Sequence, residues 1–597
     1  MKEFDILDLL DSENLPLKNR MNEKGYYAPV PTEQLTRTAG AQDADRGSDV
    51  RVDRGASCEI SEKLNRVPLA REERPLIPIE PLLSGEQYRF HFDMSRCVGC
   101  QCCVVACNEQ NNNPASVHWR RVGEIEGGTY PDTKKYHLSM ACNHCLDPSC
   151  LTGCPTDAYV KLEDGIVKHQ AEECIGCGYC TWNCPYGVPQ FNPERNIVTK
   201  CDMCHSRLKD GQLPACVAAC PQEAIQIEKV NRSEWQHDHK QADAPYVPDS
   251  GMTLSTTRIT LPQDAPENML RANRHRIEPE KPHTSLIFMT VLTQLATGGF
   301  LTLWLGDFLS RFLDFLRPLQ DFLAFGTCGM LIVTETALFA AVFHLGRPLY
   351  AYKALKMWKR SWLSKEVLLF ALFSAIGAGY AGGTLASHFG RVPFPSGLRI
   401  LLGGFVVVLG LAGVYASAKI YLVPARPAWN TVRTPIRFFL TGFILGPLFA
   451  LVVYAFYAAV HIQDVPDPFY KGPIFAFIGV STIAGLLQLI VLLSRLFSLR
   501  RDETDELYAS AFLLIHRFKK LFVARLLFLF SGSFIVPFML LEFSTFQDSL
   551  NGSLIGLALA SFILSLLGEL LGRYLFFVTV VPKNIPGSFF TTNGRPH

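Results

Sequence analysis

The chain has 597 residues, with 57 Lys and Arg against 55 Asp and Glu, and its formal net charge is +2. No basic patch interleaved with aromatic residues occurs outside the loops that flank apolar segments, so we expect no nucleic-acid partner. The length exceeds that of one ordinary domain. The first 282 residues are polar and cysteine-rich, whereas apolar runs dominate the remainder.

Residues 1–85 are rich in charge, proline and small polar residues and show no sustained hydrophobic period. We expect them to form an extended or disordered arm. The opening stretch MKEFDILDLLDSENL is acidic and lacks a basic segment followed by an apolar run. It therefore predicts neither a secretory signal nor a twin-arginine signal.

Sixteen of the nineteen cysteines form four groups of four between residues 97 and 220. The groups are Cys97, Cys100, Cys103 and Cys107; Cys142, Cys145, Cys150 and Cys154; Cys174, Cys177, Cys180 and Cys184; and Cys201, Cys204, Cys216 and Cys220. A CxxCxxC run offers three thiolates to one iron–sulfur cube, and a further CxxxC step directs the fourth thiolate to a neighbouring cube. Proline follows the fourth cysteine in the last three groups, as in bacterial ferredoxins, whereas Asn108 follows it in the first.

Zinc and disulfides are the alternative uses of so many cysteines. Zinc ribbons pair two well-separated CxxC units, whereas four cysteines within a short run crowd a zinc tetrahedron. A disulfide framework suits a short secreted chain. We therefore predict four [4Fe–4S] clusters, and free thiols at the remaining Cys58, Cys102 and Cys328.

The pseudo-twofold symmetry of ferredoxins predicts that groups exchange their fourth cysteine. Groups two and three exchange their fourth cysteines, and so do groups one and four. The module of groups two and three thus lies, in the sequence, inside the module of groups one and four. Four ligand sets result: set one, Cys97, Cys100, Cys103 and Cys220; set two, Cys142, Cys145, Cys150 and Cys184; set three, Cys174, Cys177, Cys180 and Cys154; set four, Cys201, Cys204, Cys216 and Cys107.

Eight apolar stretches follow Ser285, each long enough to cross the hydrocarbon core of a bilayer as a helix. They lie at about 285–305, 322–343, 367–387, 399–421, 437–461, 473–494, 521–542 and 554–578. The even number places both ends of this half on one side of the membrane. We thus predict a ferredoxin-like α+β four-cluster domain at 86–230, a polar linker at 231–282 and an all-α eight-helix transmembrane bundle at 283–597.

Basic residues are distributed unequally between the loops of the predicted bundle. Seventeen Lys and Arg lie in loops on the side shared with the cysteine-rich region, against five on the opposite side. Because loops rich in Lys and Arg stay in the cytoplasm, this bias predicts that the clusters face the cytoplasm of a bacterial inner membrane.

Ionisable residues inside or beside membrane helices are candidates for function, because burying them is costly. Glu335 lies within the second helix, His344 lies at its cluster-side end, and Glu366 begins the third helix on that side. A quinone exchanges two protons with its two electrons, and a histidine beside a carboxylate supplies the required hydrogen bonds and proton transfer. We expect a quinone site there, with Arg347 in the adjoining loop.

Two further patterns have competing interpretations. His388 and His461 lie near helix ends, and a haem bridging them is the rival cofactor; we favour quinone because no histidine lies in mid-helix. Glu569 and Arg573 are spaced i, i+4 on the last helix, which favours a structural salt bridge.

Both halves resemble one family. The runs CNHCLDPSC, CIGCGYCTWNCPYGVPQFN and KCDMCHSRL resemble the iron–sulfur subunit of dimethyl sulfoxide reductase and its relatives. The runs HLGRP, LSKE, RTPIRFFLTGFILGP and GELLGR resemble the eight-helix anchor subunit of the same complexes. The resemblance implies a quinone site, for menaquinone or ubiquinone, at His344 and Glu366, but it offers no counterpart for Glu335.

The resemblance also implies a separate molybdopterin-containing catalytic subunit, because this chain shows no molybdopterin-binding segment. We expect an electron-transfer and membrane-anchor subunit that links that partner to quinone in the lipid bilayer. Dimethyl sulfoxide reductase itself faces the periplasm, whereas the loop charges here favour the cytoplasm, as in membrane-bound sulfite dehydrogenases. The alternatives are a self-sufficient ferredoxin:quinone oxidoreductase and, from another class, a zinc-stabilised membrane scaffold.

Overall fold

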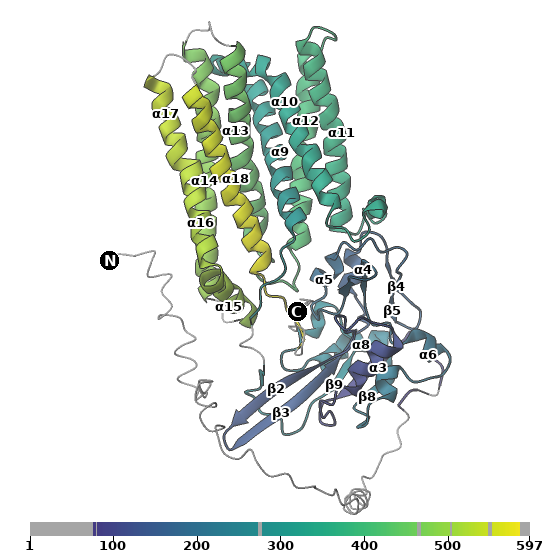
Figure 1. The fold of residues 1–597 in the computed structure, drawn as a ribbon. Helices are drawn as coiled ribbons and strands as arrows, with labels where there is room; N and C mark the ends of the chain where they lie inside the picture. The colour runs from purple at the N-terminus through teal and green to yellow at the C-terminus, as the bar shows by residue number, and fades with distance from the viewer. Residues whose placement is uncertain are drawn as a thin grey trace, which may run out of the picture. The chain divides into compact units, whose positions relative to one another are not determined.

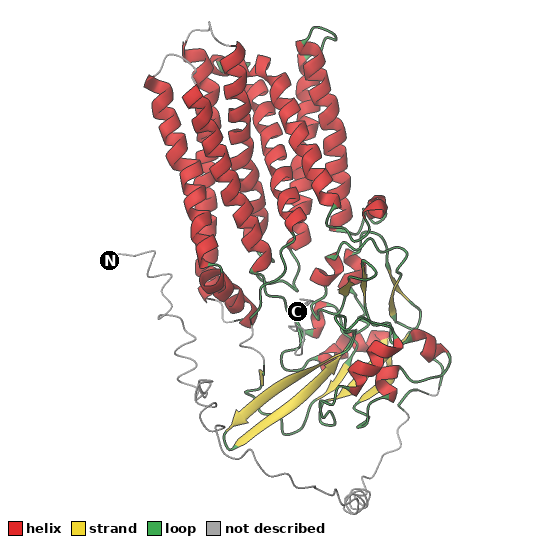
Figure 2. Ribbon diagram, in the orientation of Figure 1, coloured by secondary structure: helices red, strands yellow, loops and turns green. Residues whose placement is uncertain are grey.

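The computed structural model describes residues 76–78, 80–272, 277–461, 467–501, 504–546 and 552–585. Most of the predicted arm, together with Cys58, lies outside the described residues. In the described part, an α+β region is followed by long helices (Figure 1). Figure 2 shows that the strands are confined to the α+β region. The predicted order of a ferredoxin-like region and a helical bundle is therefore confirmed.

The first sheet of the α+β region has the strand order β8, β1 and β9. Strand β1 (Glu86–Asp93) pairs antiparallel with β8 (Ile225–Asn231) and parallel with β9 (Arg258–Thr260). Phe90 and Phe92 of β1 are buried against the same core as Ile225 and Ile227 of β8. The two ends of the cysteine-rich region are thereby joined in one sheet.

A second sheet has the order β10, β2 and β3, in which β2 (Arg121–Thr129) and β3 (Asp132–Met140) form a hairpin and β10 is Leu270–Arg271. The predicted linker at 231–282 thus adds β9 and β10 to the two sheets, together with helix α8 (Arg232–Asp238). Trp235 of α8 is buried and donates to the carbonyl of Ser255 at 2.7 Å. This segment therefore belongs to the packed α+β region. The sequence predicted a linker because its polar composition gives no sign of such short strands.

Short elements carry the cysteines. The helices are α3 (Cys102–Gln110), α4 (Ser149–Gly153), α5 (Tyr179–Asn183), α6 (His205–Lys209) and α7 (Ala215–Ala218). The two-stranded ladders are β4 (Tyr159–Lys161) with β5 (Val167–His169), and β6 (Gln190–Asn192) with β7 (Ile197–Thr199). Each helix is at most nine residues long, so tertiary interactions rather than helix propensity must stabilise them.

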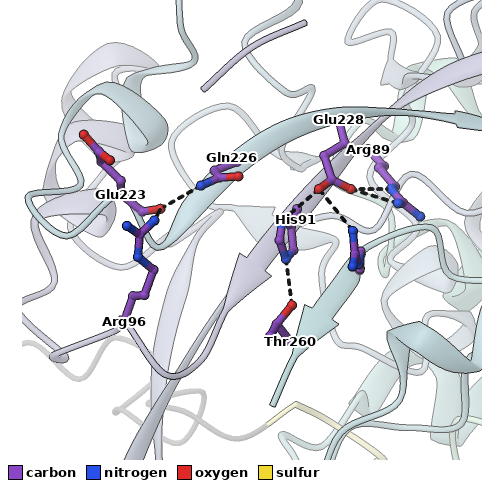
Figure 3. Close-up of polar contacts among 8 residues, drawn as sticks. Arg89, His91, Arg96, Glu223, Gln226, Glu228 and Thr260 are labelled. Carbon is purple, nitrogen blue, oxygen red and sulfur yellow. Dashed lines mark hydrogen bonds and ion pairs between the residues drawn. The ribbon is translucent and has the colours of Figure 1, made fainter. Parts of the chain in front are cut away.

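Glu228 of β8 is the centre of a polar cluster that ties the first sheet together (Figure 3). Its carboxylate accepts from Arg89 of β1 at 2.8 Å and lies 2.8 Å from His91 Nδ1 and 3.5 Å from Arg258 of β9. Burial opposes ionisation, but the His91 hydrogen bond and the two arginine charges outweigh it and lower the pKa of Glu228 to about 2. The carboxylate is therefore a charged crosslink among three strands.

The described helices include eight that are long and apolar enough to cross a membrane, as predicted. They are α9 (Thr284–Leu309), α10 (Pro318–Val342), α11 (Trp362–His388), α12 (Ser396–Tyr421), α13 (Arg433–His461), α14 (Asp467–Arg501), α16 (Lys519–Phe530) continued by α17 (Val536–Phe546), and α18 (Gly552–Val578). A π-helical turn, η9 (Ser531–Ile535), joins α16 to α17. Between α14 and α16 lies the short α15 (Asp505–Phe512).

Helix α9 is the most buried of the eight, and its apolar window is 78% buried. Glycines on both sides bring α9 and α13 into backbone contact: a Cβ at Gly442 would lie 2.7 Å from the carbonyl oxygen of Gln294. Small residues allow this close approach of helices in membranes. The predicted span boundaries differ from the structure by a few residues at most ends, whereas α14 is longer at both ends than the stretch 473–494.

Candidate functional site

Ligand set one surrounds a cavity. Cys97, Cys100, Cys103 and Cys220 all line it, together with Ser139 and Pro221. The pairing of β1 with β8 explains how Cys220, from the far end of the region, reaches the CxxCxxC run.

Ligand set two surrounds a second cavity, lined by Cys142, Cys145, Cys150 and Cys184. Lys200 and Thr253 also line it, and the Thr253 hydroxyl donates to Cys145 Sγ at 3.1 Å. Here the fourth cysteine again comes from a different group of the sequence.

In sets three and four, the thiols that influence one another's pKa also come from different groups of the sequence. Burial, together with the nearby Cys154 and Cys174, raises the pKa of Cys177 to about 12. Burial also raises the pKa of Cys107 to about 12, with contributions from Cys216 and Cys204. Cys154 is thus near two thiols of set three, and Cys107 is near two thiols of set four.

These thiols form donor sets that fit iron–sulfur clusters. Buried thiols that repel one another resist ionisation until a cation binds them, because metal ligation requires the thiolate. Backbone amides point at three of the sulfurs: Ala158 N donates to Cys154, Met203 N to Cys201 and Ala224 N to Cys220, each at 3.3 Å. Hydrogen bonds to sulfur are a usual means by which a protein stabilises an electron-rich cluster.

Two buried cations lie between neighbouring sets. Burial lowers the pKa of Lys200, but the charges of Cys142 and Cys150 in set two and Cys201 in set four outweigh it and raise the pKa. Its ammonium donates to the carbonyl of Cys201 at 2.8 Å. Sequence analysis missed Lys200, although its place directly before Cys201 was a signal.

Arg120 lies in the same way between sets one and four. It is 2% exposed and donates to the Ser139 hydroxyl at 3.2 Å, which itself lies 3.4 Å from Cys103 Sγ. The charges of Cys216 and Cys103 overcome the effect of burial and raise its pKa. Nothing in the sequence distinguished this arginine, because its position follows from the β2–β3 hairpin.

Set three contacts the loop between α10 and α11, which contains η7 (Pro348–Leu355). Gly346 N donates to Gly176 O at 3.3 Å and Arg347 N to Ile175 O at 3.0 Å, within the turn that joins Cys174 to Cys177. The Arg347 side chain donates to Ala171 O at 3.0 Å. This arginine, expected at a quinone site, therefore holds the loop against set three.

Further contacts join the same loop to the chain around Cys154. Ser361 Oγ donates to Gly153 O at 2.7 Å and Ser364 Oγ to Pro155 O at 3.3 Å. Ion pairs link Arg360 to Asp157, and Lys353 and Lys356 to Glu173. Several basic residues counted in the loop-charge bias are thus used in this contact.

His344 lies directly before that contact, after the end of α10. Burial lowers its pKa to about 4, so the imidazole is neutral near pH 7. Its Nδ1 is hydrogen-bonded to the carbonyl of Ala341. A neutral ring that donates through Nδ1 leaves Nε2 as a proton acceptor. His283, directly before α9, lies near enough to influence His344, and sequence analysis missed it.

Glu366, on α11, is 4% exposed and lies close to Ser417 of α12. Tyr179 of α5 lies between this carboxylate and set three: burial raises its pKa, and both Glu366 and Cys177 raise it further. Among the described side chains, no hydrogen bond or ion pair joins Glu366 to His344. Both nevertheless flank the contact between set three and the bundle.

Glu335 lies apart from this group. Glu335 precedes His344 by nine residues, a distance of about 13 Å along a helix axis. Its carboxylate accepts from Ser374 on α11 and is exposed on the bundle surface. The structure therefore does not bring Glu335 to the predicted quinone site.

The structure also describes parts of the two remaining patterns, the histidines considered for haem and the expected salt bridge on the last helix. His388 packs against Phe325 and Phe389, with ring centroids 5.1 and 5.4 Å away, and the His461 side chain lies outside the described part. The expected salt bridge between Glu569 and Arg573 is wrong: in the described structure Glu569 accepts from Thr441 and Gln488, and Arg573 donates to Gln294. The i, i+4 spacing left both side chains free to find partners on other helices.

Aromatic rings also join set three to the bundle. Trp182, between Cys180 and Cys184, is 5% exposed. Its ring lies 5.3 Å from His283, 5.7 Å from Tyr421 and 5.4 Å from Trp429, between centroids. Tryptophan at this position buries a large apolar surface between the two regions.

Comparisons with known proteins match both regions. The family of the DMSO reductase anchor subunit (DmsC) matches residues 280–578, and the 4Fe-4S dicluster domain matches residues 133–230. The expected resemblance is confirmed in both regions, and the match to a 4Fe-4S domain supports the predicted iron–sulfur clusters over the zinc alternative.

Curated relatives match the cysteine-rich region. An anaerobic dimethyl sulfoxide reductase component of Haemophilus influenzae is 40% identical over 172 residues, which cover 27% of this chain and 84% of the relative. YnfG of Escherichia coli, a probable component of an anaerobic dimethyl sulfoxide reductase, is 41% identical over 167 residues, covering 27% and 82%. A sulfite dehydrogenase subunit of Allochromatium vinosum is 36% identical over 154 residues, covering 22% and 64%. The present chain is a member of the dimethyl sulfoxide reductase family, as an iron–sulfur electron-transfer region and a multi-pass membrane anchor joined in one polypeptide.

Proposed function

We propose that this chain carries electrons through four [4Fe–4S] clusters between a separate molybdopterin-containing catalytic subunit and the quinone pool of a bacterial cytoplasmic membrane. The observation that carries the proposal is the pair of backbone hydrogen bonds from Gly346 and Arg347 to the turn of set three. These bonds hold His344 beside the last cluster of the path.

The buried residues between the sets give the path an order. Arg120 lies between sets one and four, and Lys200 lies between sets four and two. Tyr159, which is 2% exposed, lies between Cys150 of set two and Cys180 of set three. The proposed order is therefore one, four, two and three, with set three at the membrane.

Bound clusters supply one-electron transfer, and the protein supplies burial, amide donors and proton exchange. At the quinone, His344 Nε2 accepts a hydrogen bond from a quinol hydroxyl, because Nδ1 is already committed to Ala341. Glu366, buried on the other side of the contact, exchanges the second proton. Tyr179 is buried near both Glu366 and Cys177.

Set one is proposed to receive the catalytic subunit. Cys100 is exposed, and Val98 and Val105 beside it are 59% and 65% exposed. Apolar side chains exposed beside a redox centre suit a protein partner, which would shield the cluster from water. The names of the relatives, which are components of dimethyl sulfoxide reductase and sulfite dehydrogenase, support such a partner.

The clusters are proposed to face the cytoplasm. The basic loops lie at the cluster side of the bundle, as the positive-inside rule requires. Lys353, Lys356 and Arg360 pair with acidic residues of the cluster region, and Arg437, Arg495 and Arg525 are buried within helices. The support therefore comes from the remaining basic residues at this side of the bundle.

Metal analysis of the purified complex tests the proposal. Four clusters require about sixteen irons per chain, and a stoichiometric molybdenum-containing subunit should copurify. Eight irons, or zinc in place of iron, would contradict the four-cluster path. Full iron content without molybdenum in any copurifying subunit would favour the self-sufficient ferredoxin:quinone oxidoreductase.

A further inference from the structure

Four arginines converge inside the bundle, one from each of four helices. They are Arg437 of α13, Arg495 of α14, Arg525 of α16 and Arg573 of α18, and none is more than 9% exposed. We call them the arginine group. It is separate from His344 and Glu366, which lie on or beside α10 and α11.

Shared contacts place these side chains together. The guanidinium carbons of Arg437 and Arg573 lie 5.7 and 5.6 Å from the centre of the same Phe576 ring. The Arg525 guanidinium packs on Gly572, directly before Arg573, where a Cβ would lie 2.6 Å from Arg525 Cζ. Arg495 and Arg525 both lie within electrostatic range of Arg437.

Their positive charge exceeds the negative charge around it. Among the described residues, Glu569 is the acid that acts on this group, and Thr441 and Gln488 already hold its carboxylate at 2.5 and 3.2 Å. Four arginines and one glutamate leave three uncompensated positive charges among buried residues. Unpaired charge in such a site costs several kcal/mol unless a counter-ion joins it.

Several guanidinium nitrogens lack partners. In the described structure, no hydrogen-bond acceptor lies near Arg437 Nε, Arg495 Nη2, Arg525 Nε or Arg525 Nη2, all of which are buried. Arginine side chains with free N–H groups bind the oxygens of a phosphate, often two at a time. The group therefore presents both the charge and the donors of an anion site.

Its depth matches that of lipid headgroups. Each arginine lies within four to six residues of the cluster-side end of its helix, which is about 6–9 Å along the axis. Leu527 and Phe530 of α16 are 60% and 49% exposed, so this helix faces lipid while its Arg525 points inward. A phospholipid at this face can place its phosphate at the level of the arginines.

We propose that the arginine group binds a phosphate group, supplied by the headgroup of an anionic phospholipid. A neutral quinone carbonyl would not compensate the charge. The inference concerns α13, α14, α16 and α18 and does not depend on the proposed electron path.

Thermal unfolding of the delipidated full-length protein tests this proposal, with phosphatidylglycerol, phosphatidylcholine and inorganic phosphate as separate additions. Phosphatidylglycerol should raise the unfolding midpoint by about 2–4 °C through binding to the native state. Phosphatidylcholine should not. An equal gain with inorganic phosphate would support the site and assign it to free phosphate rather than to lipid.

Two variants make the test specific. Arg525→Lys keeps the charge but loses the forked donors, and it should lose at least half of the gain. Arg317→Gln removes an arginine whose side chain is 68% exposed near the opposite end of the bundle, and it should keep the gain. An unchanged gain in Arg525→Lys, or no gain with either phosphate source in the wild-type protein, would overturn the proposal. If Arg525→Lys does not fold, the wild-type comparison of the three additions still decides.

Discussion

Lys200 is a single buried charge between two of the proposed clusters. It lines the cavity of set two and donates to the carbonyl of Cys201 in set four. A fixed positive charge stabilises a cluster more after it gains an electron than before. Lys200 should therefore raise the reduction potentials of both neighbouring clusters.

Replacing Lys200 by methionine tests this effect. Lys200→Met should lower the potentials of the set two and set four clusters by about 50–100 mV, as expected for a charge several ångströms away at an intermediate dielectric. Redox titration followed by electron paramagnetic resonance measures each potential. Lys168→Met, which removes an exposed lysine of β5, should change neither. Equal shifts in both variants would show that Lys200 has no special role.

At the residue scale, sequence predicts most where the spacing of residues determines the chemistry. The cysteine register, together with the pseudo-twofold symmetry of ferredoxins, grouped Cys220 with Cys97, and the structure places both at one cavity. The sequence could not identify Tyr179, His283 or Arg120, because their roles depend on which segments the fold brings together. Glu335 was singled out as a charge within a helix, yet its side chain is exposed and bonded to Ser374.

At the scale of elements, the decisive feature is the loop from α10 to α11. A Cβ at Gly176 would lie 2.9 Å from Gly346 N and Cα, so the two glycines let the backbones touch. The loop's length and charge were visible in the sequence. The segment that this loop contacts was not visible, because basic residues in the loops of a membrane protein are first interpreted as a sign of its orientation.

Gly346→Ala should separate this loop from set three, because the new Cβ would overlap the carbonyl of Asn196. The rate at which quinone reoxidises reduced clusters should fall at least tenfold, while the cluster spectra persist. Gly397→Ala, at a site where a Cβ meets nothing within 4 Å, provides the control. A wild-type rate in Gly346→Ala would mean that the loop contact does not determine electron transfer.

Glu228 provides an element-scale prediction for pH. Its pKa is about 2 in the folded protein and 4.5 unperturbed, so its ionised form stabilises the sheet above pH 4.5, and the contribution is lost as pH falls toward 2. Glu228→Gln should cost about 1–3 kcal/mol near pH 7.

Thermal unfolding of Glu228→Gln and the wild type between pH 7 and pH 4 measures this difference. The gap in midpoint should be constant near neutral pH and begin to narrow below about pH 5. Glu194→Gln, at an exposed glutamate between β6 and β7, should match the wild type throughout. A gap that widens with acidification would contradict the role assigned to Glu228.

At the scale of the whole molecule, the two regions have different sources of stability. The cysteine-rich region has short helices and small sheets, and we expect the proposed clusters to supply much of its stability. The bundle depends on close helix packing, for example at Gly442 of α13. Composition predicted the division into two regions correctly, because membrane helices require apolar residues whereas a cluster-binding region requires cysteines. The segment 231–272 escaped prediction, since strands as short as β9 and β10 leave no periodic signal.

Electrons from the four proposed clusters are expected to reach a quinone at His344. Chemically reduced clusters of the wild-type protein should be reoxidised rapidly by an added soluble quinone analogue, as followed by stopped-flow absorbance. His344→Gln should keep all four cluster signals but be reoxidised at least a hundredfold more slowly, whereas His388→Gln should behave as the wild type. Equal reoxidation rates in wild type and His344→Gln would contradict the account.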